Sequence, residues 1–352
     1  MVDFKDFHSL TIDGHILTGY EIVRFCQKSH SKNIRAIGDF IQSWLHPSPL
    51  IQVQTSGSTG APKLIEVEKN QMLASASMTA QFFHFQSGQN ALLCLPMSYI
   101  AGKMMVVRAL YSGLNLVCVE PQSSPLQQLK SDTEIDFAPL TPMQLQHTIQ
   151  TPRVKTILLG GGPIHPELEK NTTLLQAAVF HGYGMTETLS HIALRRVNGS
   201  QASISYHTLP GITVATDQRE CLTIQVPFLK NTIVTNDVVE LVSDTAFIWK
   251  GRYDHVINSG GIKLFPEKIE KILAPILQER FFVTGIEDSL LGQKLCLVIE
   301  GESFDKEKLN QLKNKMPTLL TPYEIPKKIL FISRFSVTES GKIQRVKSLG
   351  KS

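Results

Sequence analysis

The sequence lacks the features that mark several large classes of protein. Its five cysteines lie far apart and form no CxxC pair, which argues against a metal cluster or a disulfide framework and favours a reducing compartment. It has no stretch of about 18 apolar residues, so no membrane span is expected. The first residues carry acids and no apolar run, which predicts no secretory signal and makes the cytoplasm the expected compartment.

A strong excess of charge of either sign is also missing. The net charge of +4 comes from residues 252–352, which hold 17 Lys and Arg against 12 Asp and Glu. No stripe of alternating bases and aromatic residues accompanies this charge, so nucleic acid is not an expected partner. A mildly basic segment either attracts a phosphorylated small molecule or is simply solvated. The length of 352 residues predicts two domains, and the composition leaves a homo-oligomer open.

One stretch rich in hydroxyl groups and glycine stands out, residues 54–63, with the sequence Gln-Thr-Ser-Gly-Ser-Thr-Gly-Ala-Pro-Lys. It joins the strand-like runs 50–53 and 64–67. The backbone N–H groups of such a turn form a concave site for phosphate oxygens, and Lys63 adds a point charge. A Walker loop is excluded because Pro62 precedes the lysine and Leu64 follows it. The remaining alternatives are a phosphate loop and a plain surface turn.

The segment 55–63 resembles the phosphate loop of the adenylate-forming superfamily, which includes acyl-CoA synthetases, firefly luciferase and peptide-synthetase adenylation domains. Four further motifs follow in the order typical of that superfamily. The resemblance implies that ATP and AMP are bound by the following residues of the first motif: Thr55, Ser56, Gly57, Ser58, Thr59, Gly60 and Lys63.

Strand-like and helix-like segments alternate along the chain, which predicts an α/β fold. Together with the resemblance, this implies a large N-terminal αβ domain over residues 1–253 and a small, mobile α+β domain over residues 254–352. The expected helices are 20–27, 34–45, 70–83 and 103–111; the expected strands are a pair within 8–18, then 50–53, 64–67, 91–96, 114–120, 154–159 and 177–181.

The large domain is short for the superfamily, since only about 54 residues precede the phosphate loop. The resemblance is therefore expected to cover residues 45–352 and to leave the first 45 unassigned. Either the site is more open than usual or a second chain covers it.

Two glycine-containing segments follow predicted strands, where ligands bind in open α/β sheets. In the first, 160–163, the absence of Cβ atoms lets a flat ring approach the backbone; the second, 182–187, is expected to be a turn. By resemblance the two segments hold adenine between them, with Tyr183 stacking on the base. The residues assigned to ATP or AMP are Gly161, Gly162, Pro163, His181, Gly182, Tyr183, Gly184 and Met185.

The remaining catalytic assignments also rest on the resemblance. Thr186 would bind the α-phosphate, Glu187 would hold Mg²⁺, and Asp237 would accept the ribose hydroxyls. Arg252 would reach the ribose or a phosphate, and Lys342 would bridge the attacking carboxylate and the α-phosphate. Without the resemblance, the alternatives are a helix-capping acid for Glu187, an ordinary ion pair for Arg252 and a solvated side chain for Lys342.

The hinge and thioester assignments come from two adjoining motifs. Asp254 would be the pivot between the domains, and Gly260 and Gly261 would border the arm of coenzyme A. Pro266 predicts the start of a helix whatever the function is.

The acid-binding assignment rests on the segment 95–111. Tyr99 stands where the superfamily usually has a histidine at the acyl pocket, Gly102 ends this motif, and Lys103 begins the helix behind it. This otherwise apolar helix carries Arg108, which suits the second carboxylate of a dicarboxylic acid. Lys103 lies about 140° around the helix from Arg108, so the two do not grip one group. The alternative for Arg108 is a surface ion pair.

The segment is similar to that of o-succinylbenzoate–CoA ligases of menaquinone biosynthesis. The expected activity is therefore ATP-dependent formation of an acyl-CoA through an acyl-adenylate, with ATP, Mg²⁺ and coenzyme A as cofactor and co-substrates. The alternatives are a CoA ligase for another aromatic or small acid, and a carrier-protein-loading or non-catalytic nucleotide-binding module.

Overall fold

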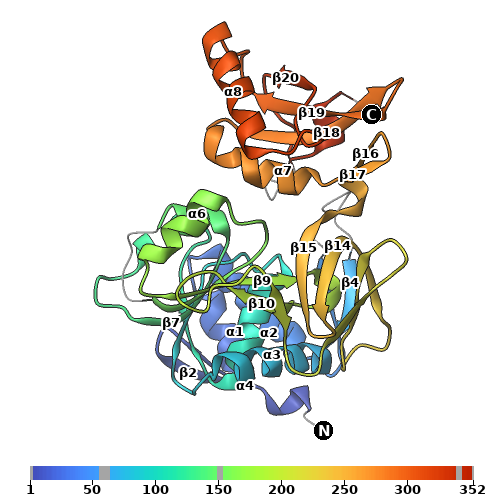
Figure 1. The fold of residues 1–352 in the computed structure, drawn as a ribbon. Coiled ribbons are helices and arrows are strands. Elements are labelled where there is room, and N and C mark those ends of the chain that lie inside the picture. Colours follow the sequence, from blue (N-terminus) through green and yellow to red (C-terminus); the bar gives the residue numbers. More distant parts are fainter. Residues whose placement is uncertain (1–2, 55–63, 149–153, 338–342, 351–352) are drawn as a thin grey trace.

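The computed structural model describes residues 3–54, 64–148, 154–337 and 343–350. The larger part of the chain is built on one mixed sheet of 13 strands (Figure 1). In spatial order the strands are β12 (Thr213–Thr216), β13 (Cys221–Gln225), β14 (Ile233–Ser243), β15 (Ala246–Arg252), β11 (Tyr206–Thr208), β10 (His191–Arg196), β9 (Ala178–Gly184), β8 (Val154–Leu159), β7 (Ile135–Leu140), β5 (Asn90–Leu93), β6 (Asn115–Cys118), β1 (Ser9–Ile12) and β2 (His15–Thr18).

In spatial order, the strands of this sheet from β9 to β1 all pair in parallel, and the edge strand β2 pairs antiparallel with β1. Helices connect its strands: α4 (Ile100–Ser112) runs from β5 to β6, α5 (Pro142–Gln146) from β7 to β8 and α6 (Pro166–Asn171) from β8 to β9. The carboxyl ends of these parallel strands therefore lie at one edge, where ligands bind in open α/β sheets. The predicted α/β fold is confirmed.

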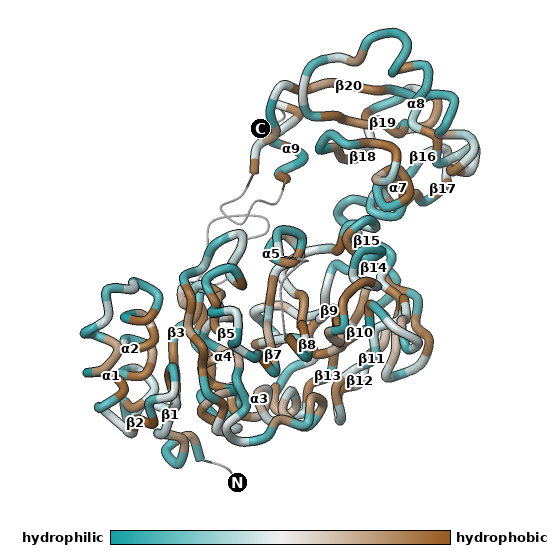
Figure 2. Tube along the Cα trace, turned by 90° about the vertical axis from the view of Figure 1, so that its left-hand side faces the viewer, coloured by the Kyte–Doolittle hydropathy of each residue, from teal (hydrophilic) through white to brown (hydrophobic). Residues whose placement is uncertain are grey.

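The N-terminal segment forms a helix pair, α1 (Tyr20–Gln27) and α2 (Lys32–Leu45), at one side of the large sheet (Figure 2). A hairpin of β3 (Leu50–Gln54) and β4 (Leu64–Glu68) leads into α3 (Lys69–Phe83). The buried ammonium of Lys69 donates to the carbonyls of Trp44 (2.9 Å) and His46 (2.7 Å). These carbonyls lie at the C-terminal end of α2. The ammonium group therefore supplies their missing hydrogen bonds and interacts favourably with the negative end of the helix dipole.

The smaller part contains a five-stranded sheet with the order β17 (Ile262–Leu264), β16 (Ile257–Ser259), β19 (Gly292–Glu300), β18 (Phe281–Asp288), in which β20 (Lys328–Ile332) also pairs with β19. Its helices are α7 (Pro266–Leu273), α8 (Lys306–Leu319) and α9 (Arg345–Ser348). Two buried apolar clusters lie within residues 4–247 and two more within residues 257–335. The domain boundary after residue 253 stays a prediction.

The predicted helices and strands of the first half are confirmed, within a few residues at their ends. The predicted turn over 182–187 is partly wrong, because β9 continues to Gly184 and only Thr186–Thr188 forms a short 3₁₀ helix, η4. β10 pairs with β9 at very close range here: a Cβ on Gly184 would lie 2.6 Å from Cα of His191. The glycine thus permits close strand pairing, where a turn was expected.

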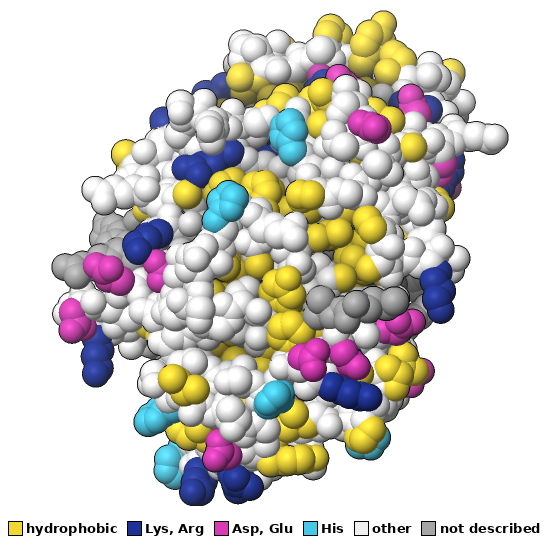
Figure 3. Space-filling view, turned by 90° about the horizontal axis from the view of Figure 1, so that it is seen from below, with side chains coloured by type: hydrophobic (Ala, Val, Ile, Leu, Met, Phe, Trp, Pro, Cys, Tyr) yellow, Lys and Arg dark blue, Asp and Glu magenta, His cyan; other side chains and the backbone are white. Residues whose placement is uncertain are grey.

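Within the described ranges, no helix is long and apolar enough to cross a membrane. Seen from below, the molecule has hydrophobic side chains gathered in a central band, with basic and acidic side chains mixed towards the edges (Figure 3). This face therefore does not present the continuous basic surface that nucleic acid needs.

Candidate active site

The turn that follows β8 leaves room for a flat ring. A Cβ atom built on Gly160 or Gly162 would meet no described atom within 4 Å, and Gly161 has a φ of +84°, which favours glycine. The carbonyl of Gly162 lies 3.0 Å from Nε2 of the buried His181 on β9. Burial lowers the pKa of His181 to about 4, so this ring is neutral at pH 7. The structure thus joins the two predicted adenine-binding segments through His181.

A second cluster surrounds the buried carboxylate of Asp237 on β14. Tyr183 donates its hydroxyl to Oδ2 at 2.7 Å, and Trp249 of β15 donates Nε1 to Oδ1 at 3.1 Å. The guanidinium of Arg252 lies 3.8 Å from Oδ1. Burial and the charge of Asp237 raise the pKa of Tyr183 well above its usual range, so its proton stays in place. The predicted base-stacking and ribose-binding residues therefore lie in contact.

The predicted phosphate and metal residues lie in η4, directly after β9. Thr186 is buried, whereas the side chain of Glu187 is exposed and has no hydrogen bond or ion pair with any described residue. The helix-capping alternative for Glu187 is therefore not supported within those ranges. The described residues contain no cluster of three or more potential metal ligands. One free carboxylate fits Mg²⁺, which commonly takes one or two carboxylates and completes its coordination with substrate phosphates.

Arg108 lies inside the larger part of the chain, on α4. Its side chain is 3% exposed, and Nη2 donates to the hydroxyl of Ser190, which lies between η4 and β10. Nε is buried and has no partner, and no acidic side chain in the described ranges pairs with the guanidinium. Burial lowers the pKa of Arg108 to about 10, which still leaves it charged at pH 7. The alternative of a surface ion pair is wrong, since the helix buries this face against the sheet.

The start of α4 lies beside the hairpin of β3 and β4, between whose strands the predicted phosphate loop falls in the sequence. Tyr99 forms an isolated parallel bridge with Gln54, and Nζ of Lys103 lies 3.4 Å from the carbonyl of Gln52. Lys103 and Arg108 thus reach different partners, as their spacing predicts. Gly102 has a packing role, because a Cβ there would lie 2.5 Å from the carbonyl oxygen of Pro96.

The predicted hinge contacts residues that lie beside Asp237, the predicted ribose-binding residue. Asp254 lies in a 3₁₀ turn, Tyr253–His255, where Arg252 pairs with Oδ2 at 2.7 Å and Asn236 donates to Oδ1 at 3.0 Å. The expected ordinary ion pair of Arg252 is thus present beside its contact with Asp237. Gly260 and Gly261 form the tight turn between β16 and β17, and both have a positive φ.

The remaining predictions cannot be placed. Residues 55–63, with Thr55, Ser56, Gly57, Ser58, Thr59, Gly60 and Lys63, and the catalytic candidate Lys342 lie outside the described residues.

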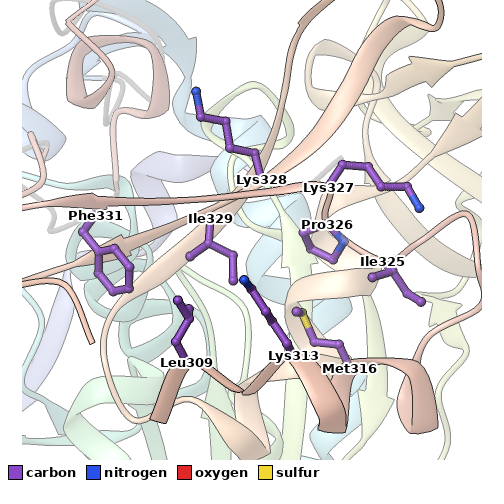
Figure 4. A pocket seen from close by; sticks show the side chains of 9 residues that line it. All are labelled: Leu309, Lys313, Met316, Ile325, Pro326, Lys327, Lys328, Ile329 and Phe331. Carbon is purple, nitrogen blue, oxygen red and sulfur yellow. The ribbon is translucent and has the colours of Figure 1, made fainter. Parts of the chain in front are cut away.

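An apolar pocket of about 390 Å³ lies elsewhere, between α8 and β20 (Figure 4). No predicted site residue lines it. Its walls are formed by Leu309, Lys313, Met316, Ile325, Pro326, Lys327, Lys328, Ile329 and Phe331.

Sequence reasoning missed several residues that shape the site. The position of Trp249 could have been predicted from a β14–β15 hairpin. In that hairpin Asp237 lies directly opposite Arg252, and the indole of Trp249 comes close to Asp237. Ser190 and Tyr206 carry no motif, and only the three-dimensional structure places them beside Arg108 and His181.

The AMP-binding enzyme family matches residues 24–218, so the expectation that the resemblance begins near residue 45 is wrong. A 2-succinylbenzoate–CoA ligase of Escherichia coli K12 is 28% identical over an alignment of 312 residues; the match covers 81% of this chain and 67% of that protein. An acyl-CoA synthetase (AMP-forming)/AMP-acid ligase II-like protein of Dyadobacter fermentans has a crystal structure that is 36% identical, with a TM-score of 0.63. The match covers 95% of this chain and 98% of that one.

The O-succinylbenzoate Coenzyme A synthetase of Bacillus subtilis, in complex with ATP and magnesium ion, has the same fold. Its TM-score is 0.70 at 20% identity, and the match covers 85% of this chain and 69% of that one. The family match and the similarity to the Dyadobacter protein show that the chain belongs to the AMP-binding enzymes, the adenylate-forming superfamily.

Proposed function

We propose that the chain is an ATP-dependent, AMP-forming acid–CoA ligase that converts o-succinylbenzoate to o-succinylbenzoyl-CoA. In the first half-reaction the acid attacks the α-phosphorus of ATP, which forms the acyl-adenylate and releases pyrophosphate. In the second half-reaction the thiol of coenzyme A attacks the acyl carbon, which forms the thioester and releases AMP. Similarity to the 2-succinylbenzoate–CoA ligases supports this activity, at modest identity.

One observation favours a dicarboxylic acid: the buried guanidinium of Arg108 has no acidic partner among the described residues. A buried guanidinium without a counter-ion is costly, and an incoming carboxylate would supply the missing partner. The hydroxyl of Ser190 accepts a hydrogen bond from one end of the guanidinium. Glu187, the proposed Mg²⁺ ligand, lies only three residues before Ser190 in the sequence. The second carboxylate of the acid would thus be held near the phosphates, with the reacting carboxylate directed towards them.

The nucleotide would lie between the glycine turn and Tyr183, with its ribose on Asp237. Tyr183 and Trp249 each occupy one oxygen of that carboxylate as donors, so they orient the lone pairs that remain for the ribose hydroxyls. Glu187 would hold Mg²⁺, which neutralises charge on the phosphates when bound. We assign the same charge-neutralising task to Lys63 and Lys342, because two anions must approach each other.

The decisive experiment measures pyrophosphate release with a panel of mono- and dicarboxylic acids, with and without coenzyme A. The proposal expects release with o-succinylbenzoate in the absence of coenzyme A and thioester formation in its presence. Faster turnover of another aromatic or small acid would favour the alternative ligase. Release without any thioester would favour a carrier-protein-loading module, and no release with any acid would contradict the catalytic assignment.

A further inference from the structure

A series of polar side chains links the glycine turn to the smaller part of the chain. Nε2 of His181 lies 3.0 Å from the carbonyl of Gly162, and Nδ1 lies 2.7 Å from the hydroxyl of Tyr206. The guanidinium of Arg195, on β10, lies over the Tyr206 ring, 5.8 Å from its centroid. Arg195 in turn donates to Oε1 of Glu169 at 2.7 Å. These groups are buried or half-buried, so water screens them only partly.

The hydrogen bonds of this series have a fixed direction. The carbonyl of Gly162 is an acceptor, so Nε2 of the neutral His181 must carry the proton. Nδ1 is then an acceptor, and the hydroxyl of Tyr206 donates to it. The orientation of the His181 ring, and with it the position of the Gly162 carbonyl, therefore depends on Tyr206.

At its other end, the series of polar side chains reaches the smaller part of the chain. Oε2 of Glu169, on α6, lies 3.7 Å from Nζ of Lys271, on α7. α6 also contacts the short 3₁₀ helix that follows α7, Ala274–Ile276, and Figure 1 places α6 on the side of the larger part that faces α7. Glu169 is thus shared between a cation of the larger part and a cation of the smaller part. The charges of Arg195 and Lys271 both lower the pKa of His181, whereas that of Glu169 raises it.

We infer that Glu169 is a positioning residue that couples nucleotide binding at the Gly162 turn to docking of α7 against α6. The contact with Lys271 holds Oε2 of Glu169 in place, so Oε1 stays on Arg195. Arg195 in turn keeps Tyr206, and through it His181, in position. Because coupling between two equilibria is reciprocal, a bound nucleotide favours the docked position of α7 by the same factor as docking favours the nucleotide. This inference rests on the proposed function only for the place of adenine beside Gly162.

The test measures AMP affinity of the full chain by calorimetry in a pair of matched variants. Lys271→Met removes the cation at Glu169, whereas Lys268→Met removes a lysine of the same helix that pairs with Glu324 inside the smaller part, at 2.7 Å. Lys271→Met should weaken AMP binding about twofold to fivefold, the range of a partly exposed ion pair. Lys268→Met should leave it unchanged, and Lys271→Arg should restore it.

Docking itself is measured with spin labels on two exposed positions, Leu174→Cys near α6 and Gln278→Cys after α7. AMP should shift the label distances towards one short distance in the otherwise unaltered chain, and this shift should be lost with Tyr206→Phe. Equal AMP affinity in the Lys271→Met and reference proteins, or equal weakening by Lys268→Met, would overturn the coupling. If the unaltered chain binds no AMP, the nucleotide assignment itself fails, which is a separate outcome.

Discussion

The hydroxyl of Tyr183 donates a 2.7 Å hydrogen bond to Asp237, which lies 54 residues later in the chain. This bond joins the residue expected beside the base to the residue expected on the ribose. Asp237 keeps its orientation because Trp249 holds its other oxygen. The two side chains proposed to bind the nucleoside are therefore held in place by protein contacts alone.

Tyr183→Phe tests this arrangement. The variant keeps the ring and removes one donor to a buried carboxylate, so the KM for ATP should rise about tenfold, with a smaller effect on the KM for the acid. Tyr111→Phe is the matched control, since it removes the same hydroxyl from a bond to Ser77 on α3. Equal KM values for ATP in the Tyr183→Phe and unaltered proteins would contradict the ribose assignment.

Arg108→Met tests the dicarboxylate site by two measurements. Loss of a charge-assisted contact should raise the KM for o-succinylbenzoate at least tenfold while the KM for ATP stays the same. The same change should increase the free energy of unfolding of the ligand-free protein, because it removes a buried charge that has no counter-ion within the described part of the chain. Lys103→Met serves as the comparison on the same helix, and a lower stability of the Arg108→Met protein would count against an uncompensated charge.

The stability of the fold should depend on pH through His181. Its pKa is about 4 in the folded chain and about 6.5 when unfolded, so the unfolded state binds more protons between these values. Stability should therefore fall as the pH drops below about 6.5, by about 2 kcal/mol at pH 5 from this group. Urea unfolding at pH 7 and pH 5 measures the loss, which His181→Asn should reduce and the exposed His207→Asn should not.

Two glycine substitutions should affect different properties of the protein, one its stability and the other its KM for ATP. Gly184→Ala places a methyl group against the backbone of Ser190 and His191, so unfolding should become easier by several kcal/mol. Gly162→Ala adds a methyl group in open space, so the melting temperature should stay nearly constant. Its effect should appear instead as a raised KM for ATP, and an unchanged KM would place the adenine elsewhere.

Lys342→Ala should separate the two half-reactions. We expect pyrophosphate release to be lost, because the variant lacks a cation between two anions, while thioester formation from supplied acyl-adenylate is retained. Equal loss of both activities would refute this division of labour.

The sequence predicts the parts of the site that are continuous in the chain. The glycine turn, the segment around Glu187 and the helix that carries Arg108 were all found from local patterns. The antiparallel half of the large sheet, β10 to β15, was not predicted, and with it were missed Trp249 and Tyr206. Their partners are set by strand pairing between distant segments, which local residue patterns do not encode.

The continuation of strand β9 to Gly184 was missed for a related reason. Glycines in such a segment indicate a turn when only the sequence is known, whereas here Gly184 allows a neighbouring strand to approach closely. The burial of Arg108 agrees with the favoured interpretation of this residue, whereas its contact with Ser190 could not be predicted, because the two residues lie 82 positions apart in the chain.

The chain has two tryptophans, and their surroundings differ sharply. Trp44 is 1% exposed in the N-terminal helix pair, where its indole donates to the carbonyl of Phe7 at 2.9 Å, whereas Trp249 contacts the carboxylate of Asp237. Fluorescence emission of a Trp44→Phe protein would therefore come from a single indole beside the proposed nucleoside site. That indole would be a built-in optical reporter of nucleotide binding.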